Sequence, residues 1–354
     1  MQNIFKAINM RKIIVKALII TLLASFGCTQ KVVEKHTKSI SDTLLINFKN
    51  KYKTLFPPSV NDKTSSQIVN QLYCGLVAYN PKNMKIQPAI AKSWKRDKTG
   101  TVYTFNLNTN VYFNSNPVFN NKPEQLTTDD IMFTFKYLCT KLPGNKNFFS
   151  LMYKIKGAKE YYDTHSDLND DFDIEGIKVI NDSTLQITTE DKDFPILDVL
   201  ALPSASIFSK KAYQQLKENC YIGAGPYSLN EEPKENASTL MLVYNPYYFL
   251  HDDSGKYYPY ISNVLISFIS SRKKELKMLQ DGKLDIILGL NNEDLLMFLK
   301  NNIEVIESKN PKFIVASTKN NVSDLQDIYV SKIKNFYPNA MSYLDLSIVY
   351  FQKK

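Results

Sequence analysis

The sequence predicts an α/β protein that is large enough for two domains. Its 354 residues exceed the usual size of a single domain, and a hydrophobic fraction of 44% can fill a substantial core. Short segments of alternating apolar residues, typical of strands, are followed by amphipathic segments of helical spacing along much of the chain. Interspersed strands and helices of this kind are typical of α/β folds.

Residues 1–28 have the pattern of an export signal. Arg11 and Lys12 form a basic segment before a ten-residue apolar run, Ala17–Phe26, which is too short to cross a bilayer and is typical of a signal sequence. The run leads into a Gly-Cys pair that is similar to a bacterial lipobox, so we expect a lipid on Cys28; a signal without a lipid is the alternative. Residues 29–41 are polar and are expected to form a flexible tether.

The folded part is expected to begin at about Asp42 with the strand Leu44–Phe48. Gln67–Tyr73 is interpreted as a short helix. Val102–Leu107 alternates and is rich in aromatic and β-branched residues, which predicts a strand, and Val111–Phe113 is expected to pair with it across a turn.

The clearest helix is expected at 127–142. Thr127 and Asp130 approximate a capping box, and an apolar face with helical spacing runs through Ile131 and Phe135. Pro143-Gly144 directly follows and should end the helix.

Local signals also place most of the later elements. Asn181-Asp182 is a turn pair between two expected strands, and Ser209 is expected to cap a helix that runs through Leu216. Further strands are expected at 177–180, 185–189, 240–244, 264–269, 284–288, 303–307 and 344–348, and further helices at 272–280, after Asn292 and from 323 to 336.

The formal charge of +9 does not by itself indicate a charged partner. Most basic residues are single lysines scattered along the chain, so we expect a solubilising surface and no nucleic-acid binding. The three histidines, His36, His165 and His251, are far apart and give no metal spacing. No catalytic motif is present, so neither an enzyme nor a cofactor is expected.

Cysteine and glycine patterns give no reactive site either. Besides Cys28 there are three cysteines, Cys74, Cys139 and Cys220; two could pair, and at least one must stay free. Gly223–Pro226 superficially resembles a phosphate loop, but it lacks a third glycine, and proline lacks the N–H that a phosphate would need. We therefore interpret it as a turn.

Several short motifs occur in an order that resembles the family 5 extracellular solute-binding proteins, the peptide- and oligopeptide-binding components of ABC importers. They are Leu72–Leu76 (LYCGL), Pro88–Trp94 (PAIAKSW), Tyr103–Leu107 (YTFNL), Leu126–Ile131 (LTTDDI), Gly223–Tyr227 (GAGPY), Asn245–Tyr248 (NPYY) and Leu279–Ile287 (LQDGKLDII). Each motif alone is weak, and the order and spacing together carry the resemblance.

The resemblance implies a periplasmic-binding-protein-like clamshell of type II, with ligand enclosed between two lobes. It implies a first α/β lobe, an inserted small α+β subdomain, and a second lobe that is strongly reduced, because too few residues follow position 290 to form it. The expected division is residues 42–80, 173–270 and 315–354 for the first lobe, 81–172 for the subdomain and 271–314 for the remnant of the second lobe.

The function implied by the resemblance is capture of peptides outside the cytoplasm by a lipoprotein that works with ABC permease subunits. The residues implied to bind the peptide are Tyr73, Cys74, Gly75, Gly225 and Tyr227. Cys74 departs from the pattern, because the family has an acidic residue there and a thiol cannot hold a positively charged ligand group. The alternative is a lobe that no longer transports and acts as an interaction module at the membrane.

Overall fold

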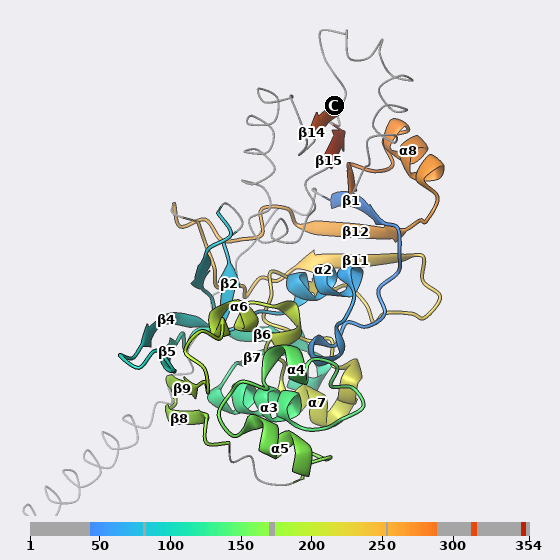
Figure 1. Ribbon diagram of the computed structural model, residues 1–354. Coiled ribbons are helices and arrows are strands. Elements are labelled where there is room, and N and C mark those ends of the chain that lie inside the picture. The colour runs from blue at the N-terminus through green and yellow to red at the C-terminus, as the bar shows by residue number, and fades with distance from the viewer. Residues whose placement is uncertain are drawn as a thin grey trace, which may run out of the picture. The chain divides into compact units, whose positions relative to one another are not determined.

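The structure is a computed structural model that describes residues 43–80, 83–169, 174–252, 254–288, 313–316 and 348–351. Seven strands of this described part form one mixed sheet (Figure 1). Their order across the sheet is β10 (Tyr227–Leu229), β11 (Thr239–Tyr244), β12 (Asn263–Phe268), β1 (Thr43–Phe48), β13 (Ile286–Leu288), β15 (Ile348–Phe351) and β14 (Phe313–Ala316).

Strand β1 lies in the middle of this sheet. It runs parallel to β12 along its whole length and parallel to β13 at Ile46, whereas the other neighbouring strands are antiparallel. The start of β1 is held by a side chain: Leu45 N–H donates to Asp285 Oδ2 over 2.8 Å, and Asp285 N–H donates back to the Leu45 carbonyl. Asp285 belongs to the Leu279–Ile287 motif, so that motif fastens the start of β13 to its neighbour β1.

A second, antiparallel sheet consists of β4 (Ala91–Arg96), β5 (Val102–Leu107), β9 (Thr184–Thr188) and β8 (Ile177–Asn181). The predicted pairing of Val102–Leu107 with Val111–Phe113 is wrong, because β5 lies between β4 and β9. Residues near 112 instead form β6 (Tyr112–Asn116), which pairs with β7 (Lys122–Gln125). The strands β2 (Val77–Tyr79) and β3 (Ile86–Pro88) form a further antiparallel pair.

Some of these pairings cross two of the expected domain boundaries. The limit at residue 172 would separate β8 and β9 from β5, with which β9 forms a continuous ladder that buries Leu185 and Ile187. The segment 271–314, expected to be a remnant of the second lobe, contains β13, whose Ile286 pairs with Ile46 of the first-lobe sheet. The division itself stays a prediction.

The helices α2 and α7 begin at a side-chain cap, and α2 (Lys63–Leu72) begins four residues before the helix expected at 67–73. Asp62 accepts from Ser65 N–H at the start of α2, and Ser209 accepts from Ala212 N–H at the start of α7. The expected helix 272–280 is found with the same ends as α8. The helices are α2 (Lys63–Leu72), α3 (Thr128–Cys139), α4 (Phe148–Leu151), α5 (Ala158–Thr164), α6 (Ile196–Leu200), α7 (Lys210–Leu216) and α8 (Arg272–Gln280).

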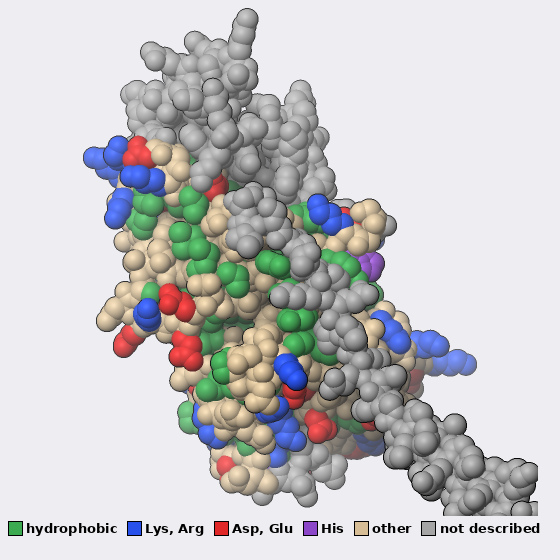
Figure 2. All heavy atoms as spheres, turned by 180° about the vertical axis from the view of Figure 1, so that it is seen from behind, with side chains coloured by type: hydrophobic (Ala, Val, Ile, Leu, Met, Phe, Trp, Pro, Cys, Tyr) green, Lys and Arg blue, Asp and Glu red, His purple; other side chains and the backbone are tan. Residues whose placement is uncertain are grey.

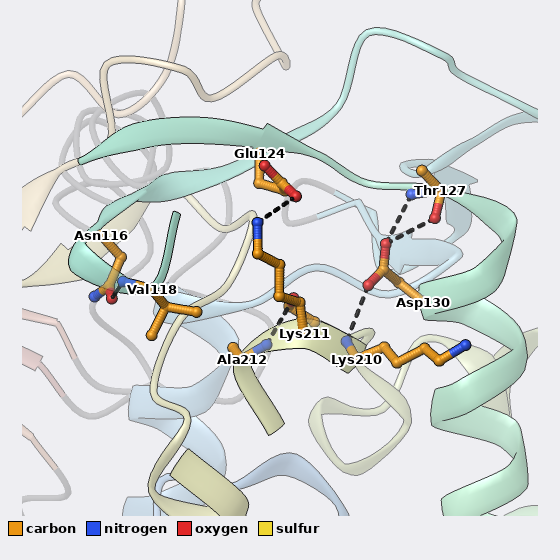
Figure 3. Close-up of polar contacts among 9 residues, drawn as sticks. Asn116, Val118, Glu124, Thr127, Asp130, Lys210, Lys211 and Ala212 are labelled. Atoms are coloured by element: carbon orange, nitrogen blue, oxygen red, sulfur yellow. Dashed lines mark hydrogen bonds and ion pairs between the residues drawn. The ribbon is translucent and has the colours of Figure 1, made fainter. Parts of the chain in front are cut away.

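Asp130 ties the predicted capping box of α3 to the start of α7. Its Oδ2 accepts from the N–H and the hydroxyl of Thr127 at 2.9 and 3.0 Å, and its Oδ1 accepts from Lys210 N–H at 2.9 Å (Figure 3). Beside it, Lys211 Nζ pairs with Glu124 Oε1 of β7 at 3.1 Å. These contacts fix the segment that precedes the Gly223–Tyr227 motif.

The charged surface agrees with the sequence interpretation. On the face shown in Figure 2, lysine and arginine side chains occur in small groups interspersed with acidic ones over the described residues. Of the helices that the structure describes, none has the length and the apolar content needed to cross a membrane.

Several expectations lie outside the described residues. They are the signal, Cys28, the tether, the helix after Asn292, the strand 303–307 and the helix 323–336. The expected last strand, 344–348, is described only at Ile348, where β15 begins.

Candidate functional site

The candidate site starts where α2 ends. After Leu72 the backbone becomes extended at Tyr73 and continues through Cys74 and Gly75 towards β2. Ile207 N–H donates to the Cys74 carbonyl over 3.0 Å, which fixes this segment against the chain beyond α6.

A small pocket lies beside this segment, with a volume of about 30 Å³. That is space for about one water molecule, whereas a site that encloses a drug-sized ligand measures roughly 300–1,000 Å³. The described lobe therefore offers one wall of a site and no enclosed cavity at this place. The lining residues are Asn70, Tyr73, Cys74, Gly75, Val77, Ala78, Tyr79, Ala201, Ser206, Pro226, Tyr248 and Leu250.

The GAGPY motif lies directly against the end of α2. Gly225 N–H donates to the Leu72 carbonyl over 3.0 Å, which satisfies one of the carbonyls left open at a helix C-terminus. A Cβ at Gly225 would lie 2.5 Å from the Leu72 carbonyl carbon, and one at Gly223 would lie 2.0 Å from the Leu72 oxygen. Only glycine allows this approach, so both glycines serve close backbone packing.

The next motif holds the GAGPY loop from the other side. Asn245 Nδ2 donates to the Gly225 carbonyl and Asn245 N–H donates to the Pro226 carbonyl, both over 2.8 Å. Tyr227 is buried, and its hydroxyl donates to the Ile261 carbonyl over 3.0 Å. As a result Pro226 is held in the pocket wall while its two neighbours pack inside the lobe.

The five residues implied to bind ligand thus separate into two groups. Tyr73, Cys74 and Gly75 line the pocket, and Gly225 and Tyr227 do not. The Tyr73 hydroxyl donates to the Cys220 carbonyl over 2.9 Å and its side chain is 2% exposed, so its hydroxyl is engaged inside the lobe. Ligand contact by these residues stays a prediction.

The cysteine thiols of the described part are in an environment that makes them unreactive. Cys74, Cys139 and Cys220 are buried and free, so the pairing left open by the sequence is not found. Burial raises the pKa of the Cys74 thiol and of the Cys220 thiol to about 12, so both stay protonated at neutral pH. Among the described residues, no group of three His, Cys, Asp or Glu side chains is arranged to hold a metal ion.

Sequence reasoning missed one polar contact beside the pocket. The hydroxyl of Tyr79, a lining residue, donates to Asp198 Oδ1 of α6 over 3.1 Å. Burial and the neighbouring Asp198 carboxylate raise the pKa of Tyr79 to about 12, so the phenol stays protonated and keeps donating. Asp198 carries no sequence signal, since it is a single acid in the apolar segment Ile196–Leu200.

The model of a family described as bacterial extracellular solute-binding proteins, family 5 Middle, matches residues 85–332. The chain belongs to this family. Proteins that are similar to it are binding proteins, and it has their α/β fold over about half of their length, in agreement with the expected reduced second lobe.

Three relatives illustrate the match. Heme-binding protein A of Haemophilus influenzae is 23% identical over 83% of this chain and 53% of its own length; OppA of Bacillus subtilis, an oligopeptide-binding protein, is 25% identical over 77% and 48%. The structure of DppA from Helicobacter pylori in complex with the peptide STSA is 23% identical, with a TM-score of 0.58, over 80% of this chain and 50% of that one. The chain spans about half the length of these relatives.

Proposed function

We propose that this protein captures peptides outside the cytoplasm for an ABC importer. The observation that carries the proposal is the pocket wall itself, which three motif residues, Tyr73, Cys74 and Gly75, help to form in a chain of this binding-protein family. Relatives that bind an oligopeptide and the peptide STSA support a peptide as the ligand, whereas Heme-binding protein A shows that the family also contains another ligand type.

A single wall predicts weak binding. Affinity depends on excluding water and on pairing the polar groups of the ligand, and the described pocket encloses only about 30 Å³. We therefore expect micromolar or weaker dissociation constants, unless a second protein or a second copy closes over the ligand.

A lipid on Cys28 would keep such a weak binder near the permease. Lipidation is tested by partition of the expressed protein into detergent and by the mass of its N-terminal peptide, with Cys28→Ser as the control. We expect the wild-type protein in the detergent phase and the variant in the aqueous phase. Equal partition of both would contradict the anchor.

Peptide capture is tested by thermal denaturation of the purified protein with pools of di- to pentapeptides. A ligand that binds only the folded state raises the melting temperature in proportion to the logarithm of its concentration. A saturable rise with one pool supports the proposal. A cooperative transition that no pool shifts, at millimolar concentrations, would refute it.

The second candidate is an interaction module at the membrane. It is favoured by one observation: the chain spans about half the length of the relatives that it matches. In that case peptides leave the melting temperature unchanged and a partner protein covers the pocket face, which crosslinking in intact cells would detect.

A further inference from the structure

Folding gathers basic side chains at the end of the large sheet where β1 and β12 finish. Two short segments lie there, residues 49–53 (KNKYK) after β1 and residues 269–274 (ISSRKK) after β12, and neither contains an acidic residue. Helix α8 begins in the second segment and lies on the side of the sheet where β1 ends (Figure 1). We call the following five residues the basic edge: Lys49, Lys53, Arg272, Lys273 and Lys274.

A buried polar network holds the two segments of the basic edge together. Asn47 of β1 is 1% exposed; its Nδ2 donates to Glu275 Oε1 of α8, and its Oδ1 accepts from Ile269 N–H, both over 2.8 Å. Burial raises the pKa of the Glu275 carboxyl, and the Asn47 amide and the charges of Arg272 and Lys49 oppose this rise. Lys49 is therefore close to the start of α8, and the basic edge is one continuous surface.

The protein leaves most of this charge uncompensated. Arg272 forms an ion pair with Glu275, which is 1% exposed. The other four members of the basic edge are exposed lysines, and no ion pair with a described residue reaches any of them. Lys51 does not belong to the edge, because its Nζ donates to the carbonyl oxygens of Lys234 and Glu235. The loop 231–235 contains three glutamates and marks the border of the edge.

We propose that the basic edge rests on the anionic headgroups of a phospholipid membrane. Of the described residues, the exposed large hydrophobic ones are Met84, Phe149, Tyr153, Val179 and Ile180, and none of these belongs to the two segments of the edge. A protein interface usually has an apolar centre, whereas anionic lipids attract lysines by charge alone, within about 10 Å of the surface. The chemistry of the basic edge therefore favours a lipid surface over a protein partner.

The proposed lipid on Cys28 would hold that surface within reach, and in this respect the inference rests on the proposed function. Fourteen residues, 29–42, separate Cys28 from Thr43, the first residue of β1. A chain of that length spans at most about 50 Å, and the basic edge begins only about 17 Å from Thr43, at the far end of the six-residue β1. An anchored chain thus meets the membrane at a high effective concentration, so a weak charge contact is enough to orient it.

Contact through the basic edge would leave the pocket accessible to its ligand. Pro226 of the pocket wall is held by Asn245, which directly follows β11. Val243 near the end of β11 pairs with Asn263, the first residue of β12, whereas the basic edge follows the last residue of β12. The pocket wall and the basic edge therefore lie at opposite ends of these strands.

The test measures binding of the full chain, purified without a lipid on Cys28, to two kinds of vesicle. One contains phosphatidylcholine alone, and the other contains equal parts of phosphatidylcholine and phosphatidylglycerol. Each lysine near an anionic surface should strengthen binding about five-fold, so loss of three should weaken the preference for anionic vesicles on the order of a hundred-fold. The edge variant is Lys49→Gln/Lys273→Gln/Lys274→Gln, and the matched control is Lys92→Gln/Lys95→Gln/Lys98→Gln, which removes the same charge from exposed positions on β4 and the turn after it.

The two variants separate the basic edge from the positive charge of the chain as a whole. A preference for anionic vesicles that the control keeps, the edge variant loses and high salt weakens would support the inference. Absent or equal binding of the wild type to the two vesicles, an edge variant that keeps the preference, or an equal loss in both variants would overturn it. Peptide capture and the lipid on Cys28 have separate tests, melting with peptides and detergent partition, so their failure is distinguished from failure of this contact.

Discussion

Replacing Gly225 by alanine tests whether the GAGPY motif builds the lobe or contacts the ligand. The added Cβ would lie 2.5 Å from the Leu72 carbonyl carbon and 2.6 Å from both Gln71 O and Tyr73 N. All three atoms belong to the backbone, so no side chain can move aside. Relief requires the loop to shift away from α2, which would break the hydrogen bond from Gly225 N–H to Leu72 O.

The magnitude follows from these two effects. Overpacking of this kind costs about 1–3 kcal/mol, and the lost hydrogen bond about 1 kcal/mol. We expect Gly225→Ala to lower the free energy of unfolding by about 2–4 kcal/mol, and the apparent melting temperature by about 4–10 °C. Urea denaturation followed by circular dichroism measures the first quantity and calorimetry the second.

Gly255→Ala is the matched control. Nothing lies within 4 Å of a Cβ at Gly255, but its φ of +82° strains any L-residue, so the change should cost only about 1 kcal/mol. Gly225 has no positive φ, so the loss of stability expected for Gly225→Ala comes only from the close approach of the added Cβ to the backbone of residues 71–73. An unchanged stability of Gly225→Ala together with lost peptide binding would refute the packing argument and favour direct ligand contact.

Three further predictions concern the framework and its pH dependence. Asp285→Ala leaves the half-buried Leu45 N–H unpaired at the start of β1 and should cost about 1–3 kcal/mol in urea denaturation, with Asp285→Asn costing less. Asp130→Ala removes two hydrogen bonds that cap α3 and one that joins α3 to α7, and it should lower the melting temperature, whereas the exposed Asp163→Ala should not. Burial raises the pKa of the Cys139 thiol above its usual 9.0, so the folded state holds that proton more tightly than the unfolded chain; stability should fall as pH rises above 9, and less steeply in Cys139→Ala.

Local signals predicted the elements well, because each depends on residues a few positions apart. The turn Asn181-Asp182 joins two antiparallel strands, the box of Thr127 and Asp130 opens α3, and Ser209 caps α7. In each case the hydrogen bonds form within three or four residues, so the chain needs no distant partner to specify them.

The prediction of strand pairing failed where the partner strand is distant in the sequence. Proximity favoured residues 111–113 as the neighbour of Val102–Leu107, yet β5 pairs with β9, about 80 residues further along the chain. The ladder between β5 and β9 buries Phe105 and Leu185 opposite each other. The free energy gained by this burial outweighs the advantage of the smaller entropy cost of closing a shorter loop. Similarly, nothing near Ile286 in the sequence indicates that β13 lies beside β1.

The sequence motifs indicated where the candidate site lies, but they did not predict the contacts that the motif residues make. The N–H of Gly225 donates a hydrogen bond to the carbonyl of Leu72, more than 150 residues earlier in the chain, and the Tyr73 hydroxyl donates to the Cys220 carbonyl. Asp198 was missed because a single exposed acid forms no pattern. Its position beside Tyr79 depends on the packing of α6 against β2, which only the folded chain shows.

The motif residues at the pocket leave little chemistry for choosing a ligand. Gly75 has no side chain, the Tyr73 hydroxyl is engaged, and Cys74 is a buried, protonated thiol. Any preference of this wall must therefore come from residues outside the LYCGL and GAGPY motifs. Tyr79 is such a residue, and through it the Asp198 carboxylate is the charged group brought to the wall. If a ligand binds at this wall, residues that the motifs do not mark would therefore select it.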